Sequence, residues 1–129
     1  METMTQEEKD LLLKDLCARL PYDVKVNCND KVYNFAGIQY FNICILTDDN
    51  ENNAFTTAGI KYIKPYLFPM SSMTDEQLPY YITTLKYSEE TRGMVETPNS
   101  FDWLNKNHYD YRGLIPMGLA LDATGMNIY

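Results

Sequence analysis

The residues best able to do chemistry in this sequence gather near its C-terminal end, around its single histidine. Asp102, His108, Asp110 and Arg112 fall in one short span. A histidine can act as a general base when a carboxylate orients its ring, and an arginine can hold an anionic group of a substrate. The span therefore indicates a small enzyme or a ligand-binding domain, provided that the four side chains converge in one concave pocket.

The same span is rich in aromatic residues, and this supports a different interpretation. Aromatic rings beside an arginine are typical of the energetic centre of a protein-binding surface. They are equally typical of a well-packed C-terminal subdomain, in which a lone histidine after a helix serves as a cap or a packing residue. The sequence leaves both interpretations open. The predicted contact surface consists of Trp103, His108, Tyr109, Tyr111 and Arg112.

The acidic loop that begins at Asp48 matches a calcium-binding loop only in part. Counted from Asp48, Asn50 and Asn52 stand at ligand positions. An EF-hand loop also needs a glycine and, later, a glutamate, where this chain has Asn53 and Gly59. We therefore expect a solvated hairpin loop here, and no metal site.

Gly113 and Gly118 have the glycine spacing of a phosphate-binding P-loop, but the rest of that motif is missing. Leu119 and Ala120 stand where phosphate and magnesium chemistry need a lysine and a serine or threonine. Pro116 also removes a backbone amide that would hold phosphate. We expect the two glycines to serve backbone turns, and the sequence predicts no cofactor and favours a protein without enzymatic activity.

Composition and charge restrict the kind of partner. The chain has 129 residues, which suits one domain over residues 1–129. Its 18 acidic and 11 basic residues give a net charge of −7, which argues against direct nucleic-acid binding because that binding rests largely on lysine and arginine. A protein partner with a basic surface would suit this charge. The 11 tyrosines suit half-buried positions and contact surfaces.

The cysteines and the N-terminal segment indicate a cytoplasmic protein. Cys17, Cys28 and Cys44 are odd in number and form no CxxC pair, so we expect buried free thiols in a reducing compartment. The segment 1–15 is acidic where a secretory signal is basic, and no stretch has the length needed to span a bilayer. We therefore expect a cytoplasmic location and no membrane partner.

Hydrophobic periodicity predicts a helix and then strands in the first half of the chain. Thr5 and Glu8 form a capping-box pattern, and Pro21 ends the helix. Apolar residues at helical spacing predict a buried stripe of Leu12, Leu13, Leu16, Cys17 and Leu20. Alternating apolar and polar residues predict strands over 22–28, 31–35, 38–46, 55–57 and 60–64, with turns at 29–30 and 36–37.

The second half is expected to hold helices and irregular segments. Residues 65–69, bounded by two prolines, are expected to form an irregular connector. A capping-box pattern predicts a helix over 74–85, with Pro79 as a kink or restart, and a polar link follows over 88–97. Thr97 before Pro98 predicts a third helix over 98–107, and a short strand is expected over 119–121.

These elements define the predicted fold class as α+β. The expected architecture is an N-terminal helix, an antiparallel β-meander of three to five strands, two C-terminal helices and an irregular tail. Apolar residues on both faces of segment 38–46 suggest a central strand covered on both sides. Closure of the sheet into a small barrel stays open.

Three blocks of sequence carry a resemblance: LLLKDLCARLPY at 11–22, KPYLFPMSSMTDEQ at 64–77 and DWLNKNHYDYRGLIPMGLALDATGMNIY at 102–129. They resemble a family of short uncharacterised proteins from gut anaerobic bacteria, their mobile elements and their phages. The blocks span just over two-fifths of the chain, and the predicted strands between them are unmatched. The family has no known activity, so the resemblance transfers no functional residue. It implies a bacterial or phage setting and favours an accessory or host-interaction role.

Three functions remain as hypotheses. The favoured one is a non-enzymatic protein–protein interaction module, such as a phage or mobile-element regulator or inhibitor of a host protein. The alternative is a small-ligand-binding domain or small enzyme that uses the tyrosine-rich C-terminal surface. A third is an acidic mimic of nucleic acid, which needs carboxylates at phosphate-like spacing, whereas the acidic pairs here are scattered and interleaved with lysines.

Overall fold

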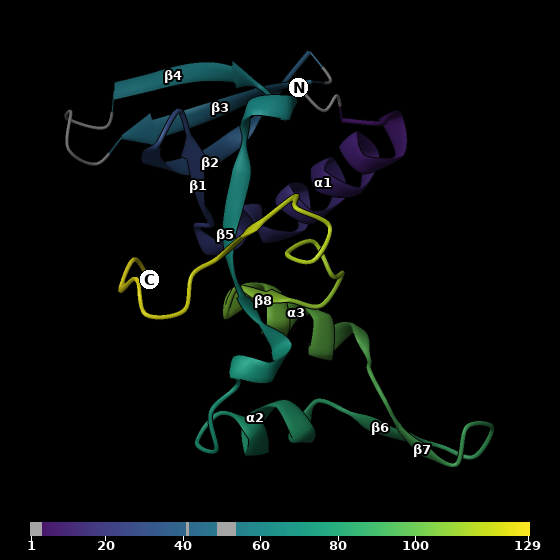
Figure 1. Cartoon of the computed structure of the whole chain (residues 1–129). Coiled ribbons are helices and arrows are strands. Elements are labelled where there is room, and N and C mark those ends of the chain that lie inside the picture. Colours follow the sequence, from purple (N-terminus) through teal and green to yellow (C-terminus); the bar gives the residue numbers. More distant parts are fainter. Residues whose placement is uncertain (1–3, 41, 49–53) are drawn as a thin grey trace.

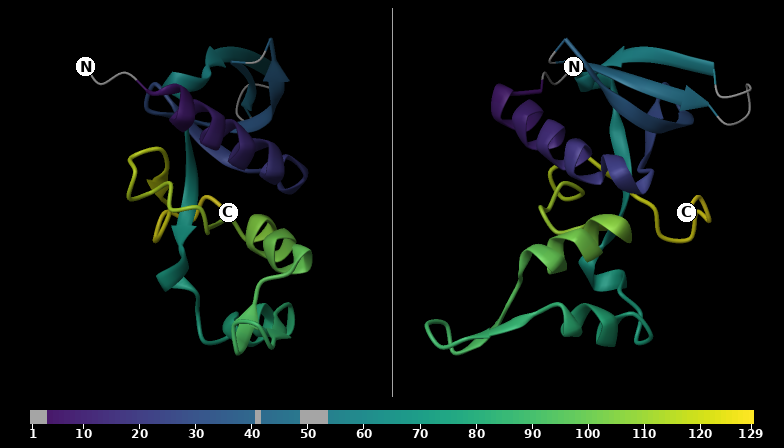
Figure 2. Two further views of the ribbon diagram at one scale, coloured as in Figure 1. Left: turned by 90° about the vertical axis from the view of Figure 1, so that its right-hand side faces the viewer. Right: turned by 180° about the vertical axis from the view of Figure 1, so that it is seen from behind.

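The computed structural model describes residues 4–40, 42–48 and 54–129, and its elements confirm the α+β class (Figure 1). Helix α1 (Gln6–Arg19) lies beneath a sheet, and strand β5 (Lys64–Pro69) runs from this sheet to a second, more helical part of the molecule (Figure 2). Within the described ranges, no helix is long and apolar enough to cross a membrane.

Helix α1 begins and ends where the sequence predicts. The backbone N–H of Glu8 donates to Thr5 Oγ1 over 3.1 Å, and the N–H of Thr5 donates to the Glu8 carboxylate over 2.9 Å. These two bonds satisfy amides that the first turn of a helix leaves without partners. A short 3-10 helix with Pro21 at its second position (Leu20–Tyr22) follows the last turn.

The buried face of α1 differs from the predicted stripe. Cys17 and Leu20 are exposed, so the expectations of a buried Cys17 and Leu20 are wrong. Asp15 and Arg19 are four residues apart and so share one face of the helix, and their ion pair occupies part of the inward face. Cys17 lies outside that face. The buried residues of the helix are Leu12, Asp15, Leu16 and Arg19.

Four strands follow: β1 (Lys25–Cys28), β2 (Lys31–Gln39), β3 (Ile43–Asp48) and β4 (Ala54–Gly59). Neighbouring strands in this series pair antiparallel, β1 with β2, β2 with β3 and β3 with β4. Asn29 and Asp30 both adopt positive φ, and they make the predicted tight turn between the first two strands. The turn predicted at 36–37 is instead a bulge inside β2, where the register shifts between Phe35 and Gly37.

The long strand predicted over 38–46 is wrong, because the chain reverses near Tyr40. Ile38 and Gln39 finish β2, Tyr40 has a φ of 52°, and β3 begins at Ile43. Apolar residues continue through this turn, so alternation alone did not mark it. Residue 41, which the prediction placed on one face of that strand, lies outside the described residues, as does most of the acidic loop, 49–53.

Strand β5 replaces the irregular connector predicted over 65–69. Its first half pairs antiparallel with β1, while its second half pairs parallel with β8 (Tyr109–Asp110) and β9 (Leu121–Asp122). The whole sheet is therefore mixed and not simply an antiparallel meander. Its strand order is the open path β4-β3-β2-β1-β5-β8, in which the two outer strands do not meet as they would in a barrel. The strand predicted over 60–64 is a 3-10 turn (Ile60–Tyr62) that leads into β5.

Residues 73–97 form a projecting segment that we call the arm. It contains α2 (Leu78–Thr83) and a hairpin of β6 (Lys86–Ser88) and β7 (Gly93–Val95). The predicted capping box forms, since Gln77 N–H donates to Thr74 Oγ1 over 3.2 Å, but the helix is shorter than the predicted 74–85. The hairpin lies where a polar link was predicted. In Figures 1 and 2 the arm extends away from α1 and the sheet.

The third helix, α3 (Pro98–Lys106), has the predicted Thr97 cap, with Ser100 N–H donating to Thr97 Oγ1 over 3.3 Å. The chain then passes through β8, turns at Gly113 and Gly118 with φ of 75° and 77°, and returns as β9. The hydrophobic core lies between α1, the inner face of the sheet and this tail. Its members are Leu12, Leu16, Val24, Val26, Cys28, Phe35, Cys44, Leu46, Ile60, Ile63, Leu67, Leu114, Leu119 and Ala120.

Candidate functional site

A buried charge cluster joins α1 to the C-terminal segment. The Asp15 carboxylate accepts hydrogen bonds from Arg19 Nε at 2.9 Å, from Arg19 Nη2 at 3.0 Å and from Arg112 Nη1 at 2.8 Å. The side chains of Asp15 and Arg19 are fully buried, and that of Arg112 is 16% exposed. A carboxylate removed from water needs this number of donors to remain charged. We call Asp15, Arg19 and Arg112 the junction.

The backbone and aromatic rings of the C-terminal segment complete the junction. Arg19 Nη2 also donates to the carbonyl oxygen of Tyr109 over 2.6 Å. The Tyr111 ring lies near both arginines, with its centroid 5.4 Å from Arg19 Cζ and 4.6 Å from Arg112 Cζ. Tyr111 is oriented by its hydroxyl, which donates to Asn105 Oδ1 over 3.0 Å. These contacts hold the end of α1 against α3 and β8, so the junction links the two halves of the molecule.

The histidine is enclosed, and among the described residues no carboxylate is hydrogen-bonded to it in the way that a general base requires. His108 is 8% exposed, and its ring stacks on Tyr129 at a centroid distance of 3.7 Å. Burial, with the nearby positive charges of Arg19 and Lys25, lowers the pKa of His108 to about 4. Its Nδ1 has no hydrogen-bond partner within the described part of the chain. With this pKa the imidazole is uncharged at neutral pH and carries a single ring proton.

Tyr129 holds the tail over the histidine. Its hydroxyl accepts from the Lys25 backbone N–H at 2.9 Å and donates to the Tyr66 carbonyl at 2.6 Å. The residue as a whole is 41% exposed, whereas its hydroxyl end is inserted between β1 and β5. This enclosure raises the pKa of the Tyr129 phenol. Tyr129 and His108 therefore support each other by packing.

The four side chains proposed from the sequence as one pocket do not converge. Asp110 is turned to the backbone, where its carboxylate accepts from the N–H groups of Leu114 and Ile115 at 2.8 and 2.9 Å. Asp102 and Arg112 line one shared cavity, but neither His108 nor Asp110 borders it. No base lies next to a nucleophile in this arrangement, so it offers no acid–base chemistry of the kind the sequence suggested.

That shared cavity lies between α1 and α3 and measures about 540 Å³. Arg112, Tyr111 and Asn105 contribute its polar inner wall, and Phe101 contributes an exposed apolar rim. Lys14 and Asp102 stand at its mouth with opposite charges. The cavity can receive a small anionic group beside the Arg112 guanidinium.

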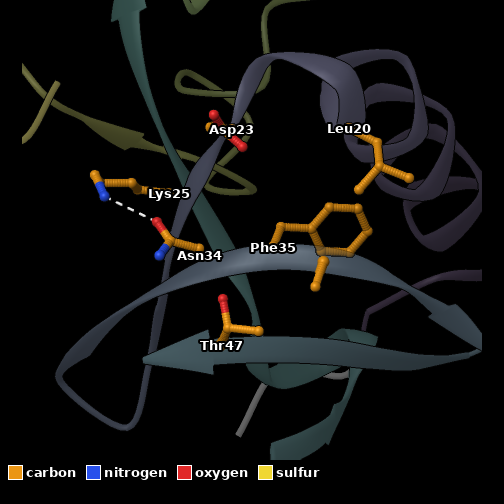
Figure 3. A pocket seen from close by; sticks show the side chains of 7 residues that line it. Leu20, Asp23, Lys25, Asn34, Phe35 and Thr47 are labelled. Carbon is orange, nitrogen blue, oxygen red and sulfur yellow. Dashed lines mark hydrogen bonds between the residues drawn. The ribbon is translucent and has the colours of Figure 1, made fainter. Parts of the chain in front are cut away.

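A second cavity, of about 550 Å³, opens between the end of α1 and strands β1 to β3 (Figure 3). Lys25 Nζ donates to Asn34 Oδ1 across it over 2.8 Å, and Asp23 and Thr47 also face the opening. Neither histidine nor cysteine lines this cavity. Its polar groups are therefore suited to solvation more than to chemistry.

The predicted contact residues are mostly placed inside the molecule. Tyr109 and His108 are buried, and Trp103 is half-buried, with its ring stacked on Tyr109 at 5.8 Å. Tyr111 and Arg112 are half-buried in the junction. Contact of these five residues with a partner stays a prediction, and the structure gives each of them an internal packing partner.

The described residues contain no cluster suited to a metal ion, and the thiols of Cys28 and Cys44 are buried. Within 4–40, 42–48 and 54–129, no group of three or more histidine, cysteine, aspartate or glutamate side chains could hold a metal ion. Asp48, at the start of the acidic loop, is buried and forms an ion pair with Lys31. Cys28 and Cys44 are buried free thiols, as expected, and burial raises the pKa of Cys44 to about 12. Such a thiol is not a nucleophile near neutral pH.

The sequence did not indicate that the arm is an exposed surface. No residue from 73 to 97 is buried, although the segment contains many apolar side chains. Tyr87 and Met94 are directly opposite each other in the hairpin and share one face. Leu78 and Ile82 share a face of α2 by their spacing, and both are exposed. The exposed apolar side chains of the arm are Leu78, Tyr80, Ile82, Tyr87 and Met94.

The arm is attached to the molecule through α2, the residues that flank this helix, and Thr97. The Thr84 carbonyl accepts from Thr97 Oγ1 at 2.8 Å and from Ser100 Oγ at 2.9 Å. The Tyr81 ring lies 5.7 Å from the Trp103 ring, and the Tyr109 hydroxyl donates to Gln77 Oε1. The inner aromatic residues of the C-terminal segment thus hold the arm in place, and the outer side chains of the arm stay exposed.

Comparison with known proteins adds no relative: no family model, no curated protein and no solved structure matches this chain.

Proposed function

We propose that this chain is a non-enzymatic protein-interaction module that docks a basic protein partner with its arm. The observation that carries the proposal is the arm itself: 25 consecutive residues, 73–97, without one buried side chain and with five exposed large apolar ones. Exposed apolar side chains gathered on one projecting segment are typical of interaction sites. Tyrosine and methionine are also enriched at such interfaces.

The charge of the arm supports a basic partner. Five acidic residues and two basic ones give this segment a net charge of −3, and all seven side chains are exposed. A negative rim around apolar anchors accelerates association with a positive surface and selects against acidic partners. The seven residues are Asp75, Glu76, Lys86, Glu89, Glu90, Arg92 and Glu96.

The setting of the proposal comes from the resemblance in sequence. In this setting the chain is a short accessory protein of a phage or mobile element, and it acts on a host protein in the cytoplasm of an anaerobic bacterium. Regulation or inhibition of such a host protein fits a chain that exposes a docking surface such as the arm. The free thiols of Cys28 and Cys44 suit a reducing compartment.

A small acidic ligand is the second candidate, because the cavity between α1 and α3 presents Arg112 beside the Tyr111 ring. Inorganic phosphate or a small carboxylate would displace solvent from the guanidinium. Isothermal titration with phosphate and with citrate tests this candidate. Binding that disappears in Arg112→Gln would support it, and no measurable heat from either anion would count against it.

The test of the main proposal is affinity capture from the lysate of an anaerobic gut bacterium, with quantitative mass spectrometry. The baits are the unchanged chain, the arm variant Tyr80→Ser/Tyr87→Ser, and the control Tyr40→Ser, whose side chain is more exposed than either but lies outside the arm. We expect one stoichiometric basic partner with the unchanged chain and the control, and its loss with the arm variant. Equal capture by the arm variant, or no enriched protein with any bait, would refute docking by the arm.

A further inference from the structure

Strand β4 is an open edge of the sheet. Within the described part of the chain, it pairs only with β3, and its opposite side faces no other strand. Its sequence, AFTTAG, contains neither a charged residue nor a proline. Proteins usually protect an exposed edge with such residues, because unpaired N–H and C=O groups otherwise bind another strand.

The backbone groups that face outward can be identified from the pairing with β3. The Ile60 N–H donates to the Asn42 carbonyl over 2.8 Å, which makes residue 60 a hydrogen-bonded position of this ladder. In an antiparallel ladder these positions alternate, so Thr56 and Ala58 also direct their backbone groups to β3. The N–H and C=O groups of Phe55, Thr57 and Gly59 therefore point away from the sheet.

This outward set is symmetric about its middle residue. A second copy of β4, antiparallel and related by a twofold axis through Thr57, sets Thr57 opposite Thr57 and Phe55 opposite Gly59. Each outward N–H then meets an outward C=O of the other copy. A self-complementary patch of this kind is what a twofold dimer requires.

The side chains match the same register. Phe55 and Tyr62 are 74% and 57% exposed, so both rings are available to a second strand at this edge. Gly59 has no side chain, and a Cβ built there would lie 3.6 Å from the Tyr62 ring. In the paired arrangement, Phe55 of one copy covers Gly59 of the other and contacts its Tyr62. An aromatic ring across from a strand glycine is a stabilising cross-strand pair.

We propose that this chain forms a symmetric dimer in which the β4 strands of two copies pair antiparallel about Thr57, so that one sheet continues through both. The self-complementary set of outward groups favours a second copy as the occupant, and the lack of charge on β4 keeps repulsion between the copies low at the contact. Each copy carries −7, so two copies approach most easily along an uncharged strip, and β4 is such a strip. The arm takes no part in this contact, so a test of the dimer is independent of a test of the proposed function.

Sedimentation velocity of the purified full chain tests this dimer. We expect a species of twice the 15.0 kDa chain mass, whose proportion rises with protein concentration and persists in about 1 M NaCl, where repulsion between the two acidic copies is screened. A monomer at every concentration would overturn the proposal.

Three variants locate the contact. Thr57→Pro removes an outward N–H and leaves the ladder with β3 intact. Phe55→Ser removes the cross-strand ring without a change to the backbone, so it remains informative if the proline variant misfolds. We expect at least a tenfold weaker dimer for both, whereas Tyr80→Ser, an equally exposed ring in the arm, stays dimeric. A dimer that Phe55→Ser leaves unchanged would refute pairing through β4.

Discussion

The arm and the edge strand β4 both expose aromatic side chains, but they differ in backbone and in charge. In the arm, the hairpin pairs Lys86–Ser88 with Gly93–Val95, and acidic residues surround the apolar side chains. At β4 the backbone of one side is open and no charged residue is present. The difference indicates what each surface selects: charge selects a foreign basic partner, whereas an open, symmetric backbone selects a second copy.

The largest effect is expected at the junction, because it joins α1 to the C-terminal segment through a fully buried ion pair. Asp15→Ala removes the carboxylate shared by Arg19 and Arg112 and leaves a fully buried guanidinium with the Tyr109 carbonyl. The loss of one partner of a buried ion pair costs about 3–5 kcal/mol of unfolding free energy. Urea denaturation followed by circular dichroism measures it. The exposed Asp10 of the same helix is the control, because Asp10→Ala should cost less than about 0.5 kcal/mol. Equal stability of the two variants would show that the junction does not hold the halves together.

A second large effect should appear on acidification, through His108. Its pKa falls from 6.5 in the unfolded chain to about 4 in the folded one, so the folded state binds the proton more weakly. The stability that neutral His108 contributes is complete above pH 6.5 and is lost as the pH falls toward 4, by roughly 3 kcal/mol at about 1.4 kcal/mol per pH unit. Unfolding free energies of the unchanged chain and of His108→Asn between pH 7 and pH 4 isolate this contribution. Asparagine tolerates the positive φ of this position. Parallel pH profiles of the two proteins would contradict it.

A smaller effect separates the arm from the edge by charge. Glu89→Lys/Glu90→Lys reverses the charge at the hairpin turn, where both side chains are exposed. We expect about tenfold weaker binding of the captured basic partner, mainly through slower association, with unchanged stability and dimerisation. Surface plasmon resonance at low and high salt measures the association rate. An unchanged association rate would mean that the arm does not meet its partner through charge.

The smallest effect concerns the order of the hairpin. Gly93 begins β7, has no positive φ and has no atom near the position of an added Cβ. Gly93→Ala should therefore stabilise the hairpin locally by about 0.4–1 kcal/mol, because alanine has fewer unfolded conformations. Hydrogen exchange of the β6 and β7 amides reports this change. Gly118→Ala is the contrasting variant, since its φ of 77° makes alanine unfavourable, and equal effects of the two would contradict the account.

The elements with strong local signals were predictable from the sequence. The Thr5 and Thr97 caps, the Asn29–Asp30 turn and the inward-facing Val24 and Val26 follow from short-range rules, and the structure confirms them. Strand β5 was not predictable, because its parallel partners β8 and β9 come more than forty residues later in the chain. Its two prolines argued locally against a strand, and tertiary pairing prevailed.

The candidate site was predictable only in its residue types. Asp15 and Arg19 have the spacing of an ordinary surface ion pair on a helix, and nothing local to them indicates that Arg112 completes a buried cluster. The aromatic span after residue 102 was correctly seen as dense, but the sequence could not tell an outer surface from an interior. The arm was not predictable as a surface, because the helical spacing in α2 shows which side chains share a face but not whether anything covers it.

Hydrogen–deuterium exchange of the chain, alone and in complex with the captured partner, tests the central claim most directly. The account predicts new protection in the arm, strongest at the amides of 86–95, and no partner-dependent change over 103–112. Protection that appears instead over 103–112, with an unaffected arm, would contradict it. The contact surface would then be the one predicted from the sequence: Trp103, His108, Tyr109, Tyr111 and Arg112.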